Sequence, residues 1–239
     1  MSGHSKWSTI KRKKGAIDAE RGKVFQKLAK EIYVAAKSGD TDPANNSALR
    51  MVIEKAKAEN MPKSNIQNAI DKAKSKSSGE DYEAVRYEGY GPGGMAIMID
   101  CLTDNKNRTA SFVRSSLTKR GGNLGTDGSV SYLFKRRGVI VLGKEYDEDK
   151  LMEDVLELDI DDMVVNDEDY TIYTSPDAFI SVKDGLDGLG YSNYIMSEVT
   201  YVADNSVSLE DEIKEKAIAL IDTLEDLDDV QEVYHNLEL

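Results

Sequence analysis

The sequence has few of the residues that form covalent cross-links, metal centres or nucleophilic sites. Its 239 residues include one cysteine, two histidines and one tryptophan. The single Cys101 excludes an internal disulfide framework, and its place in the apolar run IMIDCL favours a buried core residue over a nucleophile. His4 and His235 lie at opposite ends of the chain, so their spacing indicates no metal site.

Long hydrophobic stretches are absent as well. No apolar run approaches the roughly 20 residues that cross a bilayer, and the N-terminal residues lack the apolar segment of a secretory signal. We therefore expect a cytoplasmic protein with no membrane partner. Because 40% of the residues are hydrophobic, the chain has enough apolar side chains for a sizeable core in two or three small domains.

Patterns typical of enzymes are also missing. The stretch EGYGPGGMA is rich in glycine, but it lacks the Lys-Ser/Thr pair of a phosphate-binding loop and precedes a strand. A turn with positive φ angles explains Gly91, Gly93 and Gly94. The acidic stretch Glu225–Asp229 lacks the ligand spacing of a calcium loop. We predict no catalytic residue, cofactor, metal or small-molecule substrate, and hence no enzyme.

Charge is abundant and unevenly distributed. The formal net charge is −13, yet residues 1–76 contain 17 Lys and Arg against 8 Asp and Glu, whereas residues 143–239 contain 5 against 29. A basic excess sustained over about seventy residues favours a polyanionic partner, which indicates nucleic acid. The acidic excess is typical of a solvated surface, and it also restricts how a polyanion docks.

Apolar periodicity predicts three short helices in the basic region. Their apolar stripes are Val24, Phe25, Leu28 and Ile32, then Leu49, Val52, Ile53 and Ala56, then Ile66, Ala69, Ile70 and Ala73. Pro62 suits the first position of the third helix. The following stretch SKSSGED is typical of a linker.

From residue 82 onward, the patterns predict strands and helices. The apolar run at 94–102 predicts a strand, residues 107–122 a helix closed by glycine, and GSVSYLF at 128–134 another strand. The next predicted elements are strand 138–142, helix 147–158, strands 162–165 and 170–173, a helix within 174–186 with Ser175 as N-cap, and strand 194–201. This βαββαβ order is ferredoxin-like.

The last segment predicts a helix with Ser208 as N-cap, followed by a strand at 230–237. These elements complete a sandwich that begins before the ferredoxin-like unit. We therefore predict an α+β protein with three domains: a basic helical domain at 1–78, a discontinuous α/β sandwich domain at 79–137 plus 206–239, and an acidic, inserted ferredoxin-like domain at 138–205.

Two basic clusters carry the functional prediction. In the N-terminal arm, Trp7 stands among Lys6, Lys11, Arg12, Lys13 and Lys14. Such cations meet phosphates, and Trp7 either stacks on a base or anchors the terminus. The second cluster surrounds the helix at 107–122, where Asn105 is either part of a phosphate site at the helix N-terminus or a simple cap. Lys135–Arg137 either extends this surface or forms a solvated turn.

Five stretches of the sequence resemble the YebC family of bacterial proteins. They are GHSKW, IKRKKGAIDAERGKVFQKLAKEI, MPKSNIQNAI, YEGYGPGGMAIMIDCLTDNKNRTASFVRSSLTKRGGNLGTDGSVSYLF and DTLEDLDDVQEVYHN. The resemblance covers nearly the whole chain and is weakest at 143–205, where ELDIDDMVV and TYVADNSVSL depart from the family pattern. It implies a three-domain cytoplasmic protein that is a probable transcriptional regulator binding DNA.

The family also has relatives that act in translation, including a mitochondrial translational activator of cytochrome oxidase. The resemblance therefore implies an alternative, a ribosome-associated translation factor that contacts ribosomal RNA and assists the synthesis of difficult nascent chains. The sequence shows no zinc finger, basic zipper or obvious helix-turn-helix pattern, so both duplex DNA and ribosomal RNA stay open as partners. It indicates no oligomeric state.

The residues and the resemblance together predict one set of nucleic-acid-binding side chains. The set is His4, Ser5, Lys6, Trp7, Lys11, Arg12, Lys13, Lys14, Arg21, Lys23, Lys27, Lys106, Arg108, Arg114, Lys119 and Arg120. All of these residues precede the acidic C-terminal part of the chain. The prediction is a non-enzymatic, nucleic-acid-binding regulator.

Overall fold

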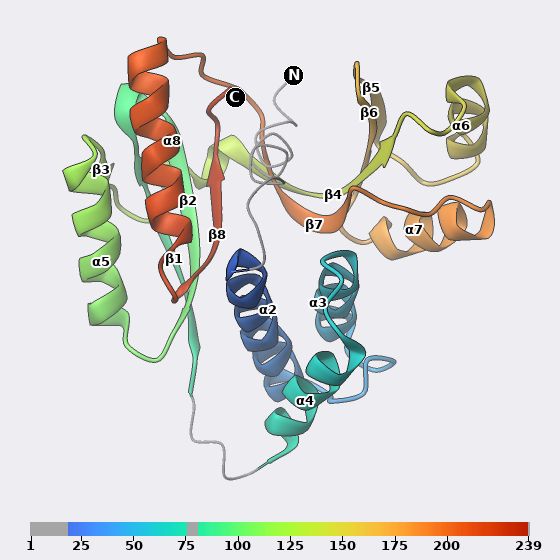
Figure 1. Cartoon of the computed structure of the whole chain (residues 1–239), viewed down its shortest axis with the longest axis horizontal. Helices are drawn as coiled ribbons and strands as arrows, with labels where there is room; N and C mark the ends of the chain where they lie inside the picture. The colour runs from blue at the N-terminus through green and yellow to red at the C-terminus, as the bar shows by residue number, and fades with distance from the viewer. Residues whose placement is uncertain (1–18, 76–80, 239) are drawn as a thin grey trace. The chain divides into compact units, whose positions relative to one another are not determined.

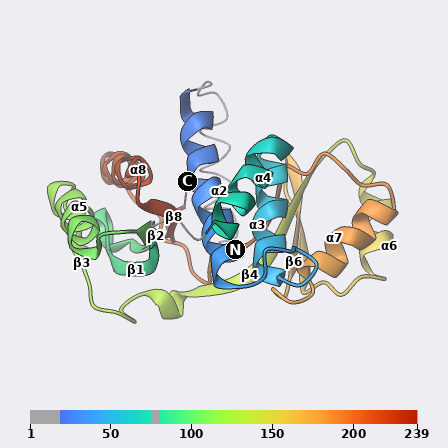
Figure 2. The same ribbon diagram turned by 90° about the horizontal axis from the view of Figure 1, so that it is seen from below.

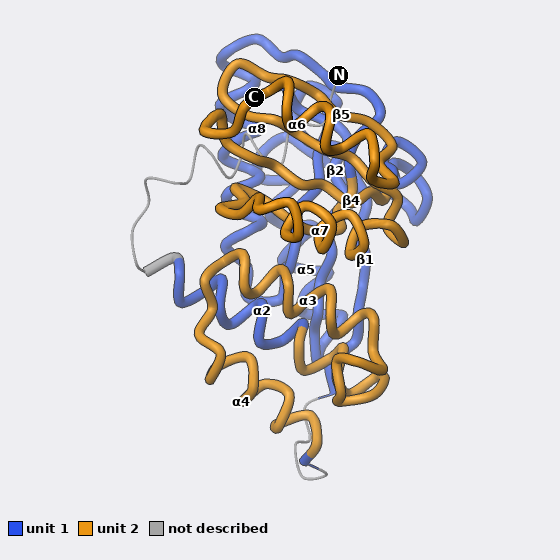
Figure 3. The backbone as a smooth tube through the Cα atoms, turned by 90° about the vertical axis from the view of Figure 1, so that its right-hand side faces the viewer, with its two compact units in different colours: residues 1–31, 75–135, 202–239 blue, residues 32–74, 136–201 orange. Residues whose placement is uncertain are grey.

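The structure is a computed structural model that describes residues 19–75 and 81–238. It has a mixed α+β architecture, with an N-terminal helical region followed by two antiparallel sheets (Figure 1, Figure 2), which confirms the predicted fold class. The chain divides into two compact units (Figure 3). Unit 1 comprises residues 1–31, 75–135 and 202–239, and unit 2 comprises residues 32–74 and 136–201. The predicted boundaries of the three domains stay a prediction.

The N-terminal helical region contains three helices within the described residues. They are α2 (Ala19–Ser38), α3 (Ser47–Ala58) and α4 (Lys63–Lys74). Each helix buries part of its predicted apolar stripe. Asn46 caps α3 by accepting a hydrogen bond from the Leu49 N–H at 3.0 Å, and its own amide donates to the carbonyls of Ala35 and Asp40. The helix α4 begins at Lys63, so Pro62 directly precedes the helix and the prediction that it takes the first helical position is wrong by one residue.

Unit 1 contains a four-stranded sheet in the order β3-β1-β2-β8, with antiparallel pairs. Its elements are β1 (Glu83–Tyr90), β2 (Ala96–Thr103), α5 (Lys106–Lys119), β3 (Asn123–Leu124), α8 (Asp211–Glu225) and β8 (Val230–His235). The helices α5 and α8 lie side by side against one face of this sheet (Figure 1). That arrangement leaves the outer side of each helix facing away from the core.

Alternate residues of β2 form the centre of this core. Because every second residue of a strand points to the same face, Ile97, Ile99 and Cys101 all reach the helices, where they pack with Val113 of α5 and Leu220 of α8. Burial raises the pKa of the Cys101 thiol to about 12. The thiol is therefore protonated at neutral pH, which confirms the interpretation of Cys101 as a core residue.

The turn between β1 and β2 explains part of the glycine-rich stretch. Residues Pro92–Gly94 form a short 3₁₀ turn in which Gly93 and Gly94 have φ angles of 68° and 75°. These are left-handed conformations that favour glycine. Gly91 has a φ of −93°, so the prediction of a positive φ is wrong at that position.

Unit 2 contains most of the second sheet, in the order β5-β6-β4-β7. Its elements are β4 (Phe134–Gly143), α6 (Glu148–Val155), β5 (Asp162–Val165), β6 (Asp169–Thr174), α7 (Phe179–Gly188) and β7 (Met196–Ala203). This is the predicted βαββαβ order. Leu151 of α6 and Phe179 of α7 pack against Ile140 and Ile172 of the sheet, so both helices cover the same face.

The predicted strand at 128–134 is wrong. The backbone N–H groups of Gly128, Val130 and Ser131 donate to the carboxylate of Glu88, at 2.8 to 2.9 Å. These donors are therefore not available to a sheet ladder, and the segment ends in a short 3₁₀ helix before β4 begins. The residues of this alternating pattern therefore form a loop around the buried carboxylate of Glu88.

Two predicted helix caps are also wrong. The Ser175 hydroxyl accepts a hydrogen bond from the N–H of Ala178, but this contact closes a turn, and α7 begins one residue after Ala178. Ser208 does not cap α8, which begins three residues later. The neighbouring Val207 donates to the carbonyl of Asn236 at 2.7 Å, and this bridge keeps the segment extended before the helix starts.

Candidate nucleic-acid interface

The sixteen predicted nucleic-acid-binding residues divide into two groups. Eight lie outside the described residues, namely His4, Ser5, Lys6, Trp7, Lys11, Arg12, Lys13 and Lys14. The other eight are Arg21, Lys23, Lys27, Lys106, Arg108, Arg114, Lys119 and Arg120. These eight all belong to unit 1, on α2 or on α5 and its C-cap. The site is therefore built from α5 and from the first half of α2.

The helix α5 is fixed at both ends and along one side. Asn105 caps its N-terminus by accepting a hydrogen bond from the Arg108 N–H at 3.0 Å, which confirms the cap interpretation of this residue. At the C-terminus, the N–H of Gly122 donates to the carbonyl of Leu117 at 2.9 Å. Because Val113 and Leu117 are fully buried, the opposite side of α5 is presented to solvent as a rigid surface.

Exposed cations lie along α5 and at both of its ends. Arg114 and Lys119 are exposed, and neither forms an ion pair with any residue in the described part of the chain. Lys106 is exposed and pairs with Glu83, while Arg120 donates to the Thr223 hydroxyl at 3.2 Å. An exposed surface pair of this kind is weak and exchanges readily. All four cations are therefore accessible to a phosphate backbone.

Phe112 is a feature of this surface that the sequence analysis missed. Its side chain is 52% exposed, although it lies in the same helix as the buried Val113 and Leu117. The spacing of the sequence could have indicated this exposure, because residue 112 lies outside the buried stripe of α5 at residues 109, 113 and 117. An exposed aromatic ring among cations is the combination on which unpaired bases stack.

Arg108 lies at the end of α5 where the helix meets the C-terminal acidic turn, residues 225–229. Its guanidinium contacts Asp104 and Asp229, each at 2.7 Å. Hydrogen bonding to Asp229, and then to Asp104, raises the pKa of Arg108. Thr109 also lies within hydrogen-bond distance of Asp229, at 2.9 Å. Burial raises the pKa of Asp229, but the contacts with Arg108 and Thr109 outweigh it, so the net shift is downward.

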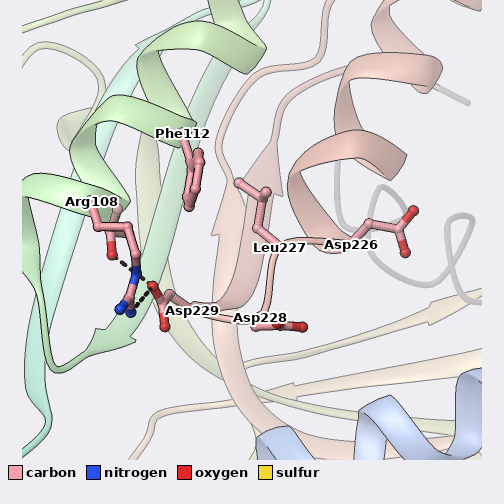
Figure 4. A pocket seen from close by; sticks show the side chains of 7 residues that line it. Arg108, Phe112, Asp226, Leu227, Asp228 and Asp229 are labelled. Atoms are coloured by element: carbon pink, nitrogen blue, oxygen red, sulfur yellow. Dashed lines mark hydrogen bonds and ion pairs between the residues drawn. The ribbon is translucent and has the colours of Figure 1, made fainter.

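A pocket of about 440 Å³ lies between α5 and the acidic turn (Figure 4). It is lined by Arg108, Thr109, Phe112, Asp226, Leu227, Asp228 and Asp229. Phe112 and Leu227 form an apolar side, while the guanidinium of Arg108 and the carboxylates form a polar side (Figure 4).

The lysines of α2 contact the same acidic turn. Lys23 forms an ion pair with Asp226 at 3.0 Å, and Lys27 donates to the carbonyl of Glu225 at 2.6 Å. Lys30, which was not in the predicted set, donates to the carbonyl of Asp228 at 2.9 Å. Lys23 and Lys27 of the predicted set, like Arg108, are therefore engaged by the acidic turn.

Other sites find no support in the described residues. Across 19–75 and 81–238, no group of three or more His, Cys, Asp or Glu side chains is arranged to hold a metal ion. Within the same residues, no helix combines the length and the apolar composition needed to cross a membrane.

Comparison with known proteins identifies the family. The family model described as the TACO1/YebC protein N-terminal domain matches residues 5–76, and the one described as the TACO1/YebC second and third domain matches residues 82–237. The chain belongs to the TACO1/YebC family. This finding confirms the resemblance seen in the sequence.

Relatives of this TACO1/YebC chain match it from end to end. "Probable transcriptional regulatory protein GK2594" of Geobacillus kaustophilus is 55% identical, over 100% of this chain and 98% of its own length. "Probable transcriptional regulatory protein YrbC" of Bacillus subtilis is 51% identical, over 99% of each chain. The crystal structure of a conserved hypothetical protein, Aq1575 from Aquifex aeolicus, is 45% identical and superposes with a TM-score of 0.81, over 92% of this chain and 91% of that one.

Proposed function

We propose that this TACO1/YebC protein is a non-enzymatic, nucleic-acid-binding regulator that acts on transcription by binding DNA. The single observation that carries the proposal is the exposed cationic side of α5, where Arg114 and Lys119 are free of ion pairs with any described residue. The names of the curated relatives support a regulatory role. We place the protein in the cytoplasm.

The geometry of α5 suits contact with a phosphate backbone. Arg114 and Lys119 are five residues apart, which separates them by about 7.5 Å along the helix axis and by about 140° around it, so they flank the exposed side of α5 and can contact different phosphates. Neutralising phosphates releases condensed counterions, which favours binding without reading the base sequence. The remaining predicted cations of the N-terminal arm, Lys6, Lys11, Arg12, Lys13 and Lys14, belong to the same proposal.

One observation favours the alternative function, a ribosome-associated translation factor that contacts ribosomal RNA. The ring of Phe112, 52% exposed beside Arg108, has no role in contacting the backbone of a paired duplex. Structured RNA exposes unpaired bases that stack on such rings. An RNA partner therefore explains one residue that duplex DNA does not.

A competition experiment separates the two functions. The purified protein is incubated with ribosomes at physiological salt, excess duplex DNA is added, and the ribosomes are sedimented. For a DNA-binding regulator we expect the protein to leave the ribosomal pellet and to remain with the DNA. Retention on ribosomes would favour the translation factor, and binding to neither would contradict the proposed function in both forms.

A further inference from the structure

The acidic turn at 225–229 forms ion pairs and hydrogen bonds with cationic side chains of two helices. Lys23, Lys27 and Lys30 of α2 contact it from one side, and Arg108 of α5 contacts it from another. All of these residues belong to unit 1. The turn therefore engages the two helices that carry the described cations of the proposed interface.

The oxygens of the acidic turn accept hydrogen bonds from the α2 lysines as the oxygens of a phosphate backbone would. The lysines at 23, 27 and 30 are spaced i, i+4 and i+7, so they lie on one side of α2. Each donates to an anionic or carbonyl oxygen of the turn, and the carbonyl of Glu225 stands at the C-terminal end of α8, where the helix dipole is negative. Lysine ammonium groups bind phosphate oxygens through the same charge-assisted hydrogen bonds.

We infer that the acidic turn is an internal competitor of nucleic acid, which holds Lys23, Lys27 and Lys30 until a phosphate backbone displaces it. The inference rests on the proposed function and adds a regulation to it. With the turn docked, the α2 lysines contribute nothing to binding. Only a ligand that also engages α5 or the N-terminal arm gains enough contacts to release them. Short or weakly charged ligands are therefore bound less tightly.

The contacts of the turn differ in how readily they exchange. The side chains of Lys23 and Asp226 are 52% and 73% exposed, so water and salt weaken their pair. Lys30 and Asp229 are only 19% and 13% exposed, and Asp229 also contacts Arg108 and Thr109. Displacement therefore starts at Asp226, which is the residue to change without disturbing the core.

The test compares Asp226→Asn with Glu215→Gln in equilibrium binding to a fluorescent oligonucleotide. Both changes remove one negative charge from an exposed position of α8 or its C-cap, but only Asp226 contacts a lysine of α2. At about 0.1 M salt, we expect Asp226→Asn to tighten binding by roughly two- to fivefold relative to Glu215→Gln. The slope of log affinity against log salt concentration should also become more negative by up to about 0.9 on duplex DNA, which is the value for one additional phosphate contact.

A double variant adds a second criterion. Because the gain depends on releasing Lys23, the combined Lys23→Gln and Asp226→Asn variant should lose the gain that Asp226→Asn shows alone. Equal affinities for Asp226→Asn and Glu215→Gln, with the wild type still binding, would overturn the inference and leave the proposed function intact. A failure of every variant to bind would overturn the proposed function and the inference together.

Discussion

Replacing both Arg114 and Lys119 by glutamate lowers the affinity for duplex DNA by at least about tenfold at physiological salt. Each substitution removes one phosphate contact and adds a repulsive charge on the outer side of α5. Because both residues are exposed and form no ion pair within the described chain, the helix keeps its packing. Fluorescence anisotropy measures the loss, and circular dichroism measures the retained fold.

The control for this prediction is the double variant Lys150→Glu and Lys214→Glu. It changes the net charge by the same amount, but on α6 and α8 instead of on α5. We expect it to lower the affinity much less, through the general field alone. Equal losses in the two double variants would mean that α5 is not part of the interface.

Replacing Glu88 by glutamine lowers the free energy of unfolding by about 1 to 3 kcal/mol at pH 7. Glu88 is 6% exposed, and its carboxylate accepts hydrogen bonds from the N–H groups of Gly128, Val130 and Ser131. A glutamine amide places an N–H group against these donors, so at least one loses its partner. Urea unfolding measures the difference, with Glu83→Gln on the same strand as a matched exposed control.

The same variant has a defined pH dependence. Burial raises the pKa of Glu88, but the N–H groups of Val130, Gly128 and Ser131 outweigh burial, so the pKa lies below its usual value in the folded protein. Its contribution to stability is therefore complete above the ordinary glutamate pKa and disappears as pH falls through the folded value. We expect the difference between wild type and Glu88→Gln to shrink in acid, and a difference that grew there would contradict this role.

Local patterns were sufficient for much of the fold. The apolar run at 94–102 predicted β2, and the segment 107–122 closed by glycine predicted α5. The strand β1 was not predicted, since EAVRYEGY contains little apolar alternation. Its charged Arg86 is instead paired across the sheet with Asp100, through contacts of 2.6 and 2.8 Å.

Long-range contacts explain what the sequence could not provide. Glu88 and Val130 are 42 positions apart, so no local pattern could indicate that the segment after Gly128 surrounds a carboxylate. Lys23 and Asp226 are 203 positions apart, and each belongs to a charge run that read as a separate surface. The candidate site was therefore predicted as a set of cations, but the pairing of some of them with the acidic turn appears only in the fold.

The central claim is that the protein binds a nucleic-acid backbone through its cations, and the salt dependence of equilibrium binding tests it most directly. Wild-type affinity is measured for duplex and single-stranded oligonucleotides over a range of salt concentrations. About five phosphate contacts predict a log-log slope near −4.5 on duplex DNA and near −3.5 on single strands. A nearly flat slope on both would contradict the claim, because it would show that backbone phosphates do not supply the binding energy.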